Sequence, residues 1–218
     1  MITLRIPSLN TISSLKMDNQ ALTHDIATNI LHTNTLNVNL RRHCYAVSVV
    51  MRALHNFLKE AGKADSSVDN LNEEDWGVVG LIHDADYEVT KDDTSKHTLL
   101  LLEWLSKYIV HAHILDAIKT HNNKVTRLKE PETLLEWSLE CCDELTGFIV
   151  ACALVQPDKK LASVDLESVK RKWKTKEFAR NVSREQIEQC QERLGISLDD
   201  FITVALTSMQ KEADKLGL

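Results

Sequence analysis

The sequence predicts an all-α protein. Apolar residues recur at intervals of three and four along most of the chain, the spacing that places them on one face of a helix. Only 6 glycines and 3 prolines occur in 218 residues, so few positions would break a helix. No segment alternates apolar and polar residues over any length, and no glycine-rich phosphate loop is present. We therefore expect helices throughout.

The first half of the chain predicts three helices. Leu22, Ile26 and Ile30 have helical spacing and predict a helix over 19–34, which the polar residues 35–39 separate from a long helix over 40–60. Gly62 should end that second helix, and residues 63–72 should form a loop. Asn72 should cap a third helix, in which acids at 73–75 face the positive end of the helix dipole. This helix should deliver His83 and Asp84 at its carboxyl end.

The second half predicts further helices. We expect a loop over 85–96, a helix over 96–108 capped by Thr94 or Ser95, a short helix over 112–121 and a loop over 122–124. Pro131 should start a strongly apolar helix that reaches Leu154. Ser183 should cap a helix that ends at Leu194, and a last helix should span 197–213. Gly195 should separate these two.

A basic segment over 159–180 lies between these parts of the chain. Its apolar stripe of Leu166, Val169 and Trp173 predicts a helix with lysines and arginines on the opposite face. These cations should either form a solvated face or fold over the phosphate of a substrate.

The length of the chain suits one domain with a small appendage. We expect three parts: a Ser/Thr-rich extension of unknown role over 1–16, a core over 17–156, and a helical extension over 157–218 that packs on that core. The boundary near Pro157 follows from the change to basic composition.

Charge and cysteine content limit the class of protein. The formal charge of −6 gives no reason to expect a nucleic-acid partner. The five cysteines form no C-x-x-C pair, which favours free buried thiols in a reducing compartment. No apolar run approaches the roughly 18 residues that a membrane span needs. We expect a cytoplasmic protein without a membrane partner, and the sequence leaves its oligomeric state open.

Histidines and aspartates in special places predict a metal site. The apolar run 78–82 leads directly into His83 and Asp84, and Asp143 lies in the middle of an apolar helix. Buried ionisable groups are costly unless they are paired or bind a metal. His43 stands in the first turn of the long helix, and such His/Asp sets suit divalent ions and hydrolysis. His55, about 18 Å further along the same helix, should not share the site.

Three stretches in order resemble the HD-domain superfamily of metal-dependent phosphohydrolases. Residues 39–47 (Asn-Leu-Arg-Arg-His-Cys-Tyr-Ala-Val) are similar to its first ligand helix. Residues 81–88 (Leu-Ile-His-Asp-Ala-Asp-Tyr-Glu) and 143–148 (Asp-Glu-Leu-Thr-Gly-Phe) resemble a subgroup of predicted HD hydrolases. The resemblance covers residues 20 to 215. It implies an all-helical HD-domain bundle.

The resemblance also implies the ligands. One divalent ion would be held by His43, His83, Asp84 and Asp143, and a second by His97 and His121 with Asp84 as the bridge. His111 and His113 are alternatives for the second site, and Asn122 stands where some two-metal relatives carry a further histidine. The metal, one ion or two, is not distinguished among Mn, Fe, Co, Ni, Zn and Mg. With ordinary histidines, affinity for a second ion should fall below about pH 6.5.

The implied activity is hydrolysis of a phosphate ester or anhydride in a small metabolite or nucleotide. We expect Asp84 and Arg42 to take part in catalysis, with Arg42, Lys91, Lys124 and Arg127 as cations for the substrate's phosphoryl group. Two alternatives share the ligand set: an HD-type di-iron oxygenase and a non-catalytic HD-fold ligand-binding protein. The sequence does not identify the substrate.

Overall fold

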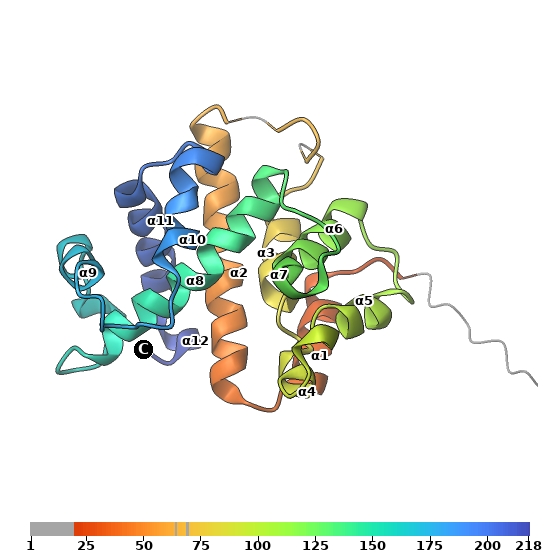
Figure 1. Cartoon of the computed structure of the whole chain (residues 1–218), viewed down its shortest axis with the longest axis horizontal. Helices are drawn as coiled ribbons and strands as arrows, with labels where there is room; N and C mark the ends of the chain where they lie inside the picture. The colour runs from red at the N-terminus through yellow and green to blue at the C-terminus, as the bar shows by residue number, and fades with distance from the viewer. Residues whose placement is uncertain (1–19, 64, 69) are drawn as a thin grey trace, which may run out of the picture.

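The predicted all-α class is confirmed. The computed structural model describes residues 20–63, 65–68 and 70–218, and within these ranges it contains helices and no strand (Figure 1). The one β interaction in the described ranges is an isolated parallel bridge between Ala21 and Ile109. The predicted extension over 1–16 lies outside the described residues.

The α-helices are numbered in chain order. They are α1 (His24–Asn34), α2 (Val38–Glu60), α3 (Glu73–Ile82), α4 (Tyr87–Thr90), α5 (Leu99–Leu105), α6 (Ala112–His121), α7 (Asn123–Thr126), α8 (Leu134–Leu154), α9 (Leu166–Trp173), α10 (Arg184–Gln189), α11 (Leu198–Lys211) and α12 (Ala213–Leu216). Two 3-10 helices, η1 (Thr94–Lys96) and η2 (Leu161–Ser163), and a π-helix, η3 (Cys190–Leu194), complete them.

The long helix α2 is the centre of the fold. It runs through the middle of the molecule in Figure 1, where α8 crosses it. Asn37 caps its first turn, and Gly62 leaves it in the left-handed conformation that glycine tolerates, with φ 67°. Helices α3, α8 and α11 pack against it. Two of these helices carry residues of the predicted site.

Helices α2 and α3 approach each other closely. A Cβ atom on Gly80 of α3 would lie only 2.7 Å from the backbone nitrogen of Ser48 on α2. The hydroxyl of Ser48 donates a 2.7 Å hydrogen bond to the Gly77 carbonyl across the same contact. Glycine at position 80 is therefore what lets the two backbones meet.

Two clusters of buried apolar residues form the core. The first cluster joins α2, α8, α11 and the carboxyl-terminal helices and includes Met51, Leu145 and Phe201. The second cluster joins α1, α3, α5 and α6 and includes Leu81 and Ile118. The segment over 157–218 adds its own buried side chains to the first cluster, so it shares the core of the rest of the chain.

Several predicted helix starts are wrong because a local cap decides them. The helix expected over 19–34 begins only at His24, and the long helix begins at Val38 instead of residue 40. The apolar helix starts at Leu134 and not at Pro131, because the Thr133 hydroxyl and the Glu136 carboxylate form a capping box.

The predicted loops are partly helical. Residues 85–96 contain α4 and η1, and the loop expected over 122–124 enters α7. The helix expected over 96–108 is limited to Leu99–Leu105, and the one expected over 183–194 changes from α to π at Cys190. Such single turns of helix carry too few residues to show a periodic pattern.

The basic segment over 159–180 packs beside α8 and α11 instead of forming one long helix. Only Leu166–Trp173 is α-helical, and Val169 of its predicted stripe is buried. Lys170 forms a 2.7 Å ion pair with Asp199 at the start of α11. This cation therefore holds two helices together.

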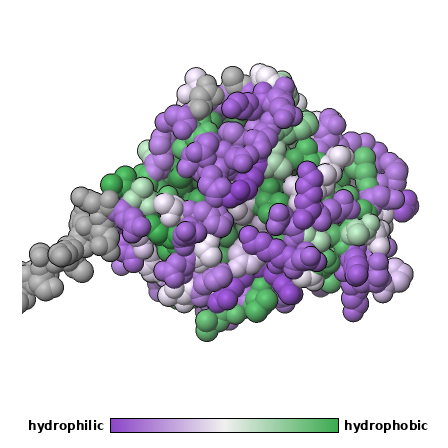
Figure 2. Space-filling model, turned by 180° about the vertical axis from the view of Figure 1, so that it is seen from behind, coloured by the Kyte–Doolittle hydropathy of each residue, from purple (hydrophilic) through white to green (hydrophobic). Residues whose placement is uncertain are grey.

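The surface and the thiols agree with the composition. The face in Figure 2 is mostly hydrophilic, with apolar residues in small separate groups. Among the described residues, no helix is both long enough and apolar enough to cross a membrane. All five cysteines are buried free thiols.

Candidate metal centre

His83 and Asp84 follow directly after the carboxyl end of α3. A cap at the amino end fixes where the helix begins. Asn72 and Asp75 form a capping box at the amino end of α3. The His83 backbone nitrogen closes the last turn on the Val79 carbonyl at 3.0 Å. Its side chain is fully buried, and its Nδ1–H donates a 2.8 Å hydrogen bond to the Gly80 carbonyl. The lone pair of Nε2 is therefore free to bind a metal.

His43 of α2 and Asp143 of α8 lie on one side of Asp84. His43 Nε2 is 2.8 Å from Asp143 Oδ1 and 3.7 Å from Asp84 Oδ2. His83 Nε2 is 3.3 Å from His43 Nε2 and 3.4 Å from Asp143 Oδ1. Four side chains from three elements thus face one another.

His97 and His121 lie on the other side of the same carboxylate. His97 Nε2 is 3.2 Å and His121 Nε2 is 3.1 Å from Asp84 Oδ1. Histidine 121 is the last residue of α6, as the sequence predicts. Histidine 97 does not lie in an opening helical turn, however, because η1 ends before it and α5 begins only at Leu99.

The six side chains fit divalent metal binding. Three overlapping groups have ligand atoms within 4.8 Å of one another: His43, His83 and Asp84; Asp84, His97 and His121; and His83, His121 and Asp143. Two ligand atoms about 2.1 Å from a shared ion lie about 3.0–3.4 Å apart, close to most of the separations here. The two oxygens of Asp84 face the first two groups separately. The structure thus brings all six predicted ligand residues into one cluster that could hold a metal.

Asp86 supports His97 and was not predicted as a site residue. Its carboxylate is fully buried, and one oxygen accepts a 2.7 Å hydrogen bond from His97 Nδ1. The other oxygen accepts one at 3.0 Å from the Leu101 backbone nitrogen in α5. This partner fixes the His97 tautomer with Nε2 directed at Asp84. The signal in the sequence was an acid two residues beyond Asp84 in a segment otherwise expected to be a loop.

We expect Asp86→Asn to weaken metal binding on the His97 side only. The amide no longer matches both the His97 Nδ1–H and the Leu101 N–H, and loss of such a partner typically costs 10- to 100-fold in metal affinity. Titration of metal-stripped protein with Co²⁺, followed by absorption, measures this. Asp93→Asn is the control, because that carboxylate is exposed and pairs with Lys96. Equal affinities in wild type and Asp86→Asn would contradict the role of Asp86.

Hydrogen bonds from Asn122 fix the segment that carries His97, and the backbone of this segment is strained at Thr98. The Asn122 side chain donates hydrogen bonds to the carbonyls of Thr94 at 2.9 Å and His97 at 3.0 Å. Asn122 thus positions a ligand instead of supplying one. The next residue, Thr98, is buried with φ 70°, which a β-branched residue rarely adopts. Backbone strain of this kind gathers at functional sites.

The carboxylates change the protonation of the histidines. Burial disfavours the charged form of His43, but Asp143 and Asp84 outweigh it and raise its pKa to about 9. Burial acts in the same direction on His97, where Asp84 and Asp86 raise the pKa to about 9. Burial also opposes the ionised form of Asp84, but the surrounding histidines hold its pKa well below the usual range. A metal ion must therefore displace protons from His43 and His97 at any pH below about 9. Metal affinity should thus begin to fall well above pH 6.5, the value expected for ordinary histidines.

We expect the metal-free protein to lose stability between pH 6.5 and pH 9. A histidine whose pKa is raised on folding stabilises the fold fully below its unfolded pKa, and this contribution disappears as pH rises through the folded pKa near 9. The lowered pKa of Asp84 acts in the opposite direction, and its contribution is lost on acidification below about pH 4. Urea unfolding with a chelator present should give a free energy lower at pH 9 than at pH 6 by on the order of 2 kcal/mol. An unchanged or higher value at pH 9 would contradict the pKa assignment.

Of the four predicted phosphate-binding cations, Lys124 lines a cavity at the site. This cavity of about 310 Å³ also contacts His121, and Lys124 Nζ lies 3.5 Å from Glu140 there. The exposed Arg42 lies with its guanidinium against Gly217 near the carboxyl terminus. Lys91 and Arg127 are exposed residues that end α4 and α7. None of these three lines the cavity at His121.

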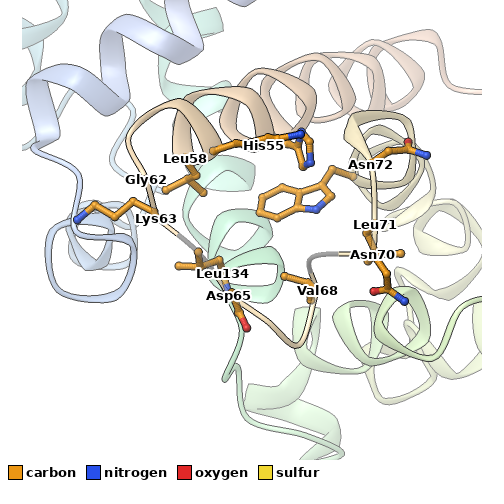
Figure 3. A pocket seen from close by; sticks show the side chains of 12 residues that line it. His55, Leu58, Gly62, Lys63, Asp65, Val68, Asn70, Leu71, Asn72 and Leu134 are labelled. Carbon is orange, nitrogen blue, oxygen red and sulfur yellow. The ribbon is translucent and has the colours of Figure 1, made fainter.

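A larger cavity of about 420 Å³ lies at the other end of α2 (Figure 3). His55 lines it, with its ring edge-on to Trp76, and so stays apart from His43 as predicted. The side chains of Lys63 and Asn72 point away from this cavity in Figure 3, and Asn72 is used as the cap of α3. The lining combines apolar side chains such as Leu58, Val68 and Leu134 with His55, Lys59, Asp65 and Asn70.

The alternative ligands His111 and His113 do not join the cluster of ligands. His111 caps α6, and its Nε2 forms a 2.9 Å hydrogen bond with Asn70. The two rings stack on each other with centroids 5.4 Å apart. The site residues are thus the six predicted ligands, supported by Asp86 and Asn122.

Comparison of the chain with protein-family models, curated proteins and solved structures found no match.

Proposed function

We propose that the protein is a metal-dependent phosphohydrolase with a two-metal centre. The observation that carries the proposal is the Asp84 carboxylate, whose Oδ2 faces His43 and His83 and whose Oδ1 faces His97 and His121. A shared carboxylate between two ligand sets is the arrangement expected of a two-metal hydrolytic site. His43, His83 and Asp143 would hold one ion with Asp84, and His97 and His121 would hold the other. Bound divalent ions supply Lewis acidity and lower the pKa of water.

The side chains of this protein would prepare the site. His83 and His97 are held by the Gly80 carbonyl and Asp86, so their Nε2 atoms need no reorientation. The side chains of His43 and Asp143 are 25% and 20% exposed, whereas that of His83 is fully buried. The substrate's phosphoryl group would therefore approach from the His43–Asp143 side. Lys124 lines the same cavity as His121 and is the cation that we expect to face the phosphoryl oxygens.

The test is metal-stripped protein reloaded with one ion at a time and assayed on a panel of phosphorylated metabolites. We expect hydrolysis with at least one of Mn, Fe, Co, Ni, Zn or Mg, and two ions bound per chain. His97→Ala and His121→Ala should each bind one ion. One ion in the wild type and in both variants would show a mononuclear site.

The same preparation tests the two alternatives. Oxygen consumption by the iron-loaded protein, with a mixed-valent signal and no phosphate release, would favour a di-iron oxygenase. Tight binding of a phosphorylated compound without turnover under any metal would favour a non-catalytic ligand-binding protein. Either result would replace the hydrolase proposal.

A further inference from the structure

The cavity beside His121 is a candidate for substrate selection. It lies between the α6–α7 junction, the first turns of α8 and helix α10, and we refer to it as the α8–α10 cavity. Its volume is about 310 Å³. Its lining consists mainly of carboxylate, amide and hydroxyl side chains: Thr120, Asn123, Glu130, Glu140, Ser183, Glu185, Gln186 and Gln189, with Lys124, His121, Pro131 and Trp137.

This cavity adjoins the metal ligands. His121 forms part of its wall while its Nε2 faces Asp84 at 3.1 Å. Glu140 precedes Asp143 by three residues on α8, so both lie on one side of that helix. The backbone nitrogen of Ser183 donates a 3.0 Å hydrogen bond to Glu144, next to Asp143. His121 is the candidate ligand that this cavity shares with the cluster, and Glu140 brings it to the side of α8 that carries Asp143, so the cavity can hold the part of a substrate that lies beyond its phosphoryl group.

The charge of the lining disfavours a second anionic group. Three carboxylates, Glu130, Glu140 and Glu185, face the cavity with one ammonium group, that of Lys124, which leaves a net charge of −2. The Lys124 ammonium is already shared with Glu140 and the Gln186 side-chain oxygen. A further phosphate or carboxylate on the substrate would meet mostly like charge.

The lining also offers more acceptors than donors. The Gln186 amide donates to the Glu140 carbonyl at 2.8 Å, and the Asn123 amide donates to Glu130 at 2.6 Å. The Thr120 hydroxyl donates to the Ala117 carbonyl at 2.8 Å. These three donors are committed within the protein, which leaves the Trp137, Ser183 and Gln189 side chains as donors toward a ligand, whereas the carboxylate oxygens can each accept further bonds. A ligand that fits must supply hydrogen-bond donors of its own.

We propose that the α8–α10 cavity receives the alcohol portion of the substrate and selects phosphate monoesters whose alcohol portion is uncharged and rich in hydroxyl groups. This inference rests on the proposed hydrolase function and narrows it to polyol or sugar phosphates. It excludes substrates with a second phosphate or a carboxylate near the ester. Glu140 and Glu185 are specificity-determining residues in this proposal.

A matched pair of substrates tests the proposal. Glycerol phosphate and glycerate phosphate, both esterified at the terminal hydroxyl, differ only by a hydroxymethyl group in place of a carboxylate. We expect kcat/KM of the metal-loaded wild type to favour glycerol phosphate by at least about tenfold, since like charges in a partly buried site repel strongly. Glu185→Lys should reduce this ratio by about three- to tenfold by converting a like charge into an attractive one.

Glu192→Lys is the matched control. This substitution changes the net charge of the protein by the same amount as Glu185→Lys. Glu192 is exposed on η3 and does not line the cavity. The ratio should stay at its wild-type value in this variant. An aryl phosphate ester serves as a third substrate that reports hydrolysis independently of the alcohol portion.

The outcomes separate the two proposals. If the aryl ester is hydrolysed, three results would overturn the proposed selectivity and leave the hydrolase proposal intact. They are a preference for glycerate phosphate, no preference between the two substrates, and an equal change of the kcat/KM ratio in Glu185→Lys and Glu192→Lys. No metal-dependent hydrolysis of any ester would overturn both.

Discussion

Replacing Asp84 with Ala should abolish binding of both metal ions and reduce hydrolysis more than about a hundredfold, because both ligand groups lose a shared donor. His97 and His121 would also lose a carboxylate that raises their pKa values. Asp143 and Asp86 would still raise the pKa values of His43 and His97. Metal analysis after dialysis and circular dichroism together check this, and the helical content should match that of wild type.

Asp92→Ala is the control for this prediction. Asp92 is an exposed carboxylate that follows α4, eight residues beyond Asp84. The control variant should retain both ions and full activity. Two equivalents of metal in Asp84→Ala would refute the bridging role, and an unfolded Asp84→Ala protein would show that the carboxylate is needed for folding itself.

Replacing Gly80 with Ala should markedly lower the stability of the fold. The new Cβ would lie 2.7–2.8 Å from backbone atoms of Val47 and Ser48, which cannot rotate away. Overpacking against backbone should cost about 2–4 kcal/mol, which exceeds the roughly 1 kcal/mol that alanine gains over glycine in a helix. Separation of α2 from α3 would also move His43 away from His83. We expect lower stability in urea and weaker metal binding together.

Gly77→Ala is the matched control on the same helix. A Cβ at this position would meet only the side chain of Arg52, whose flexible stem can move. The alanine should therefore change the free energy of unfolding by less than about 1 kcal/mol. If both variants were equally stable and bound metal alike, the close contact at Gly80 would not position the site.

The all-α class and the positions of His83, Asp84 and Asp143 followed from patterns that are local in sequence, whereas the full set of six ligands was implied by the resemblance of three stretches in order. His83 and Asp84 end an apolar run, and Asp143 interrupts one, so each is a polar group where burial requires a partner. The helix end at His121 follows from the loop residues after it. Such signals can be recognised without knowing which residues will lie next to these polar groups in the folded protein.

The supporting residues could not be predicted in the same way. Asp86 acts through His97 and the Leu101 backbone, and both contacts depend on how the chain turns between η1 and α5. The positive φ of Thr98 that makes this turn has no signature in a threonine. Arg42 is predicted as a phosphate-binding cation because it precedes His43 in the sequence. Adjacent helical residues point about 100° apart, however, and its guanidinium lies against Gly217.

The two clusters of the core meet at the metal ligands. Asp143 belongs to α8 of the first cluster, whereas His83 and His121 follow buried residues of the second, and His43 lies on α2 between them. Withdrawal of a bound metal would remove the link between these side chains, and amide exchange should then quicken in the segment around His97, where the backbone is strained at Thr98. A bound metal would in this way protect this part of the fold from local unfolding.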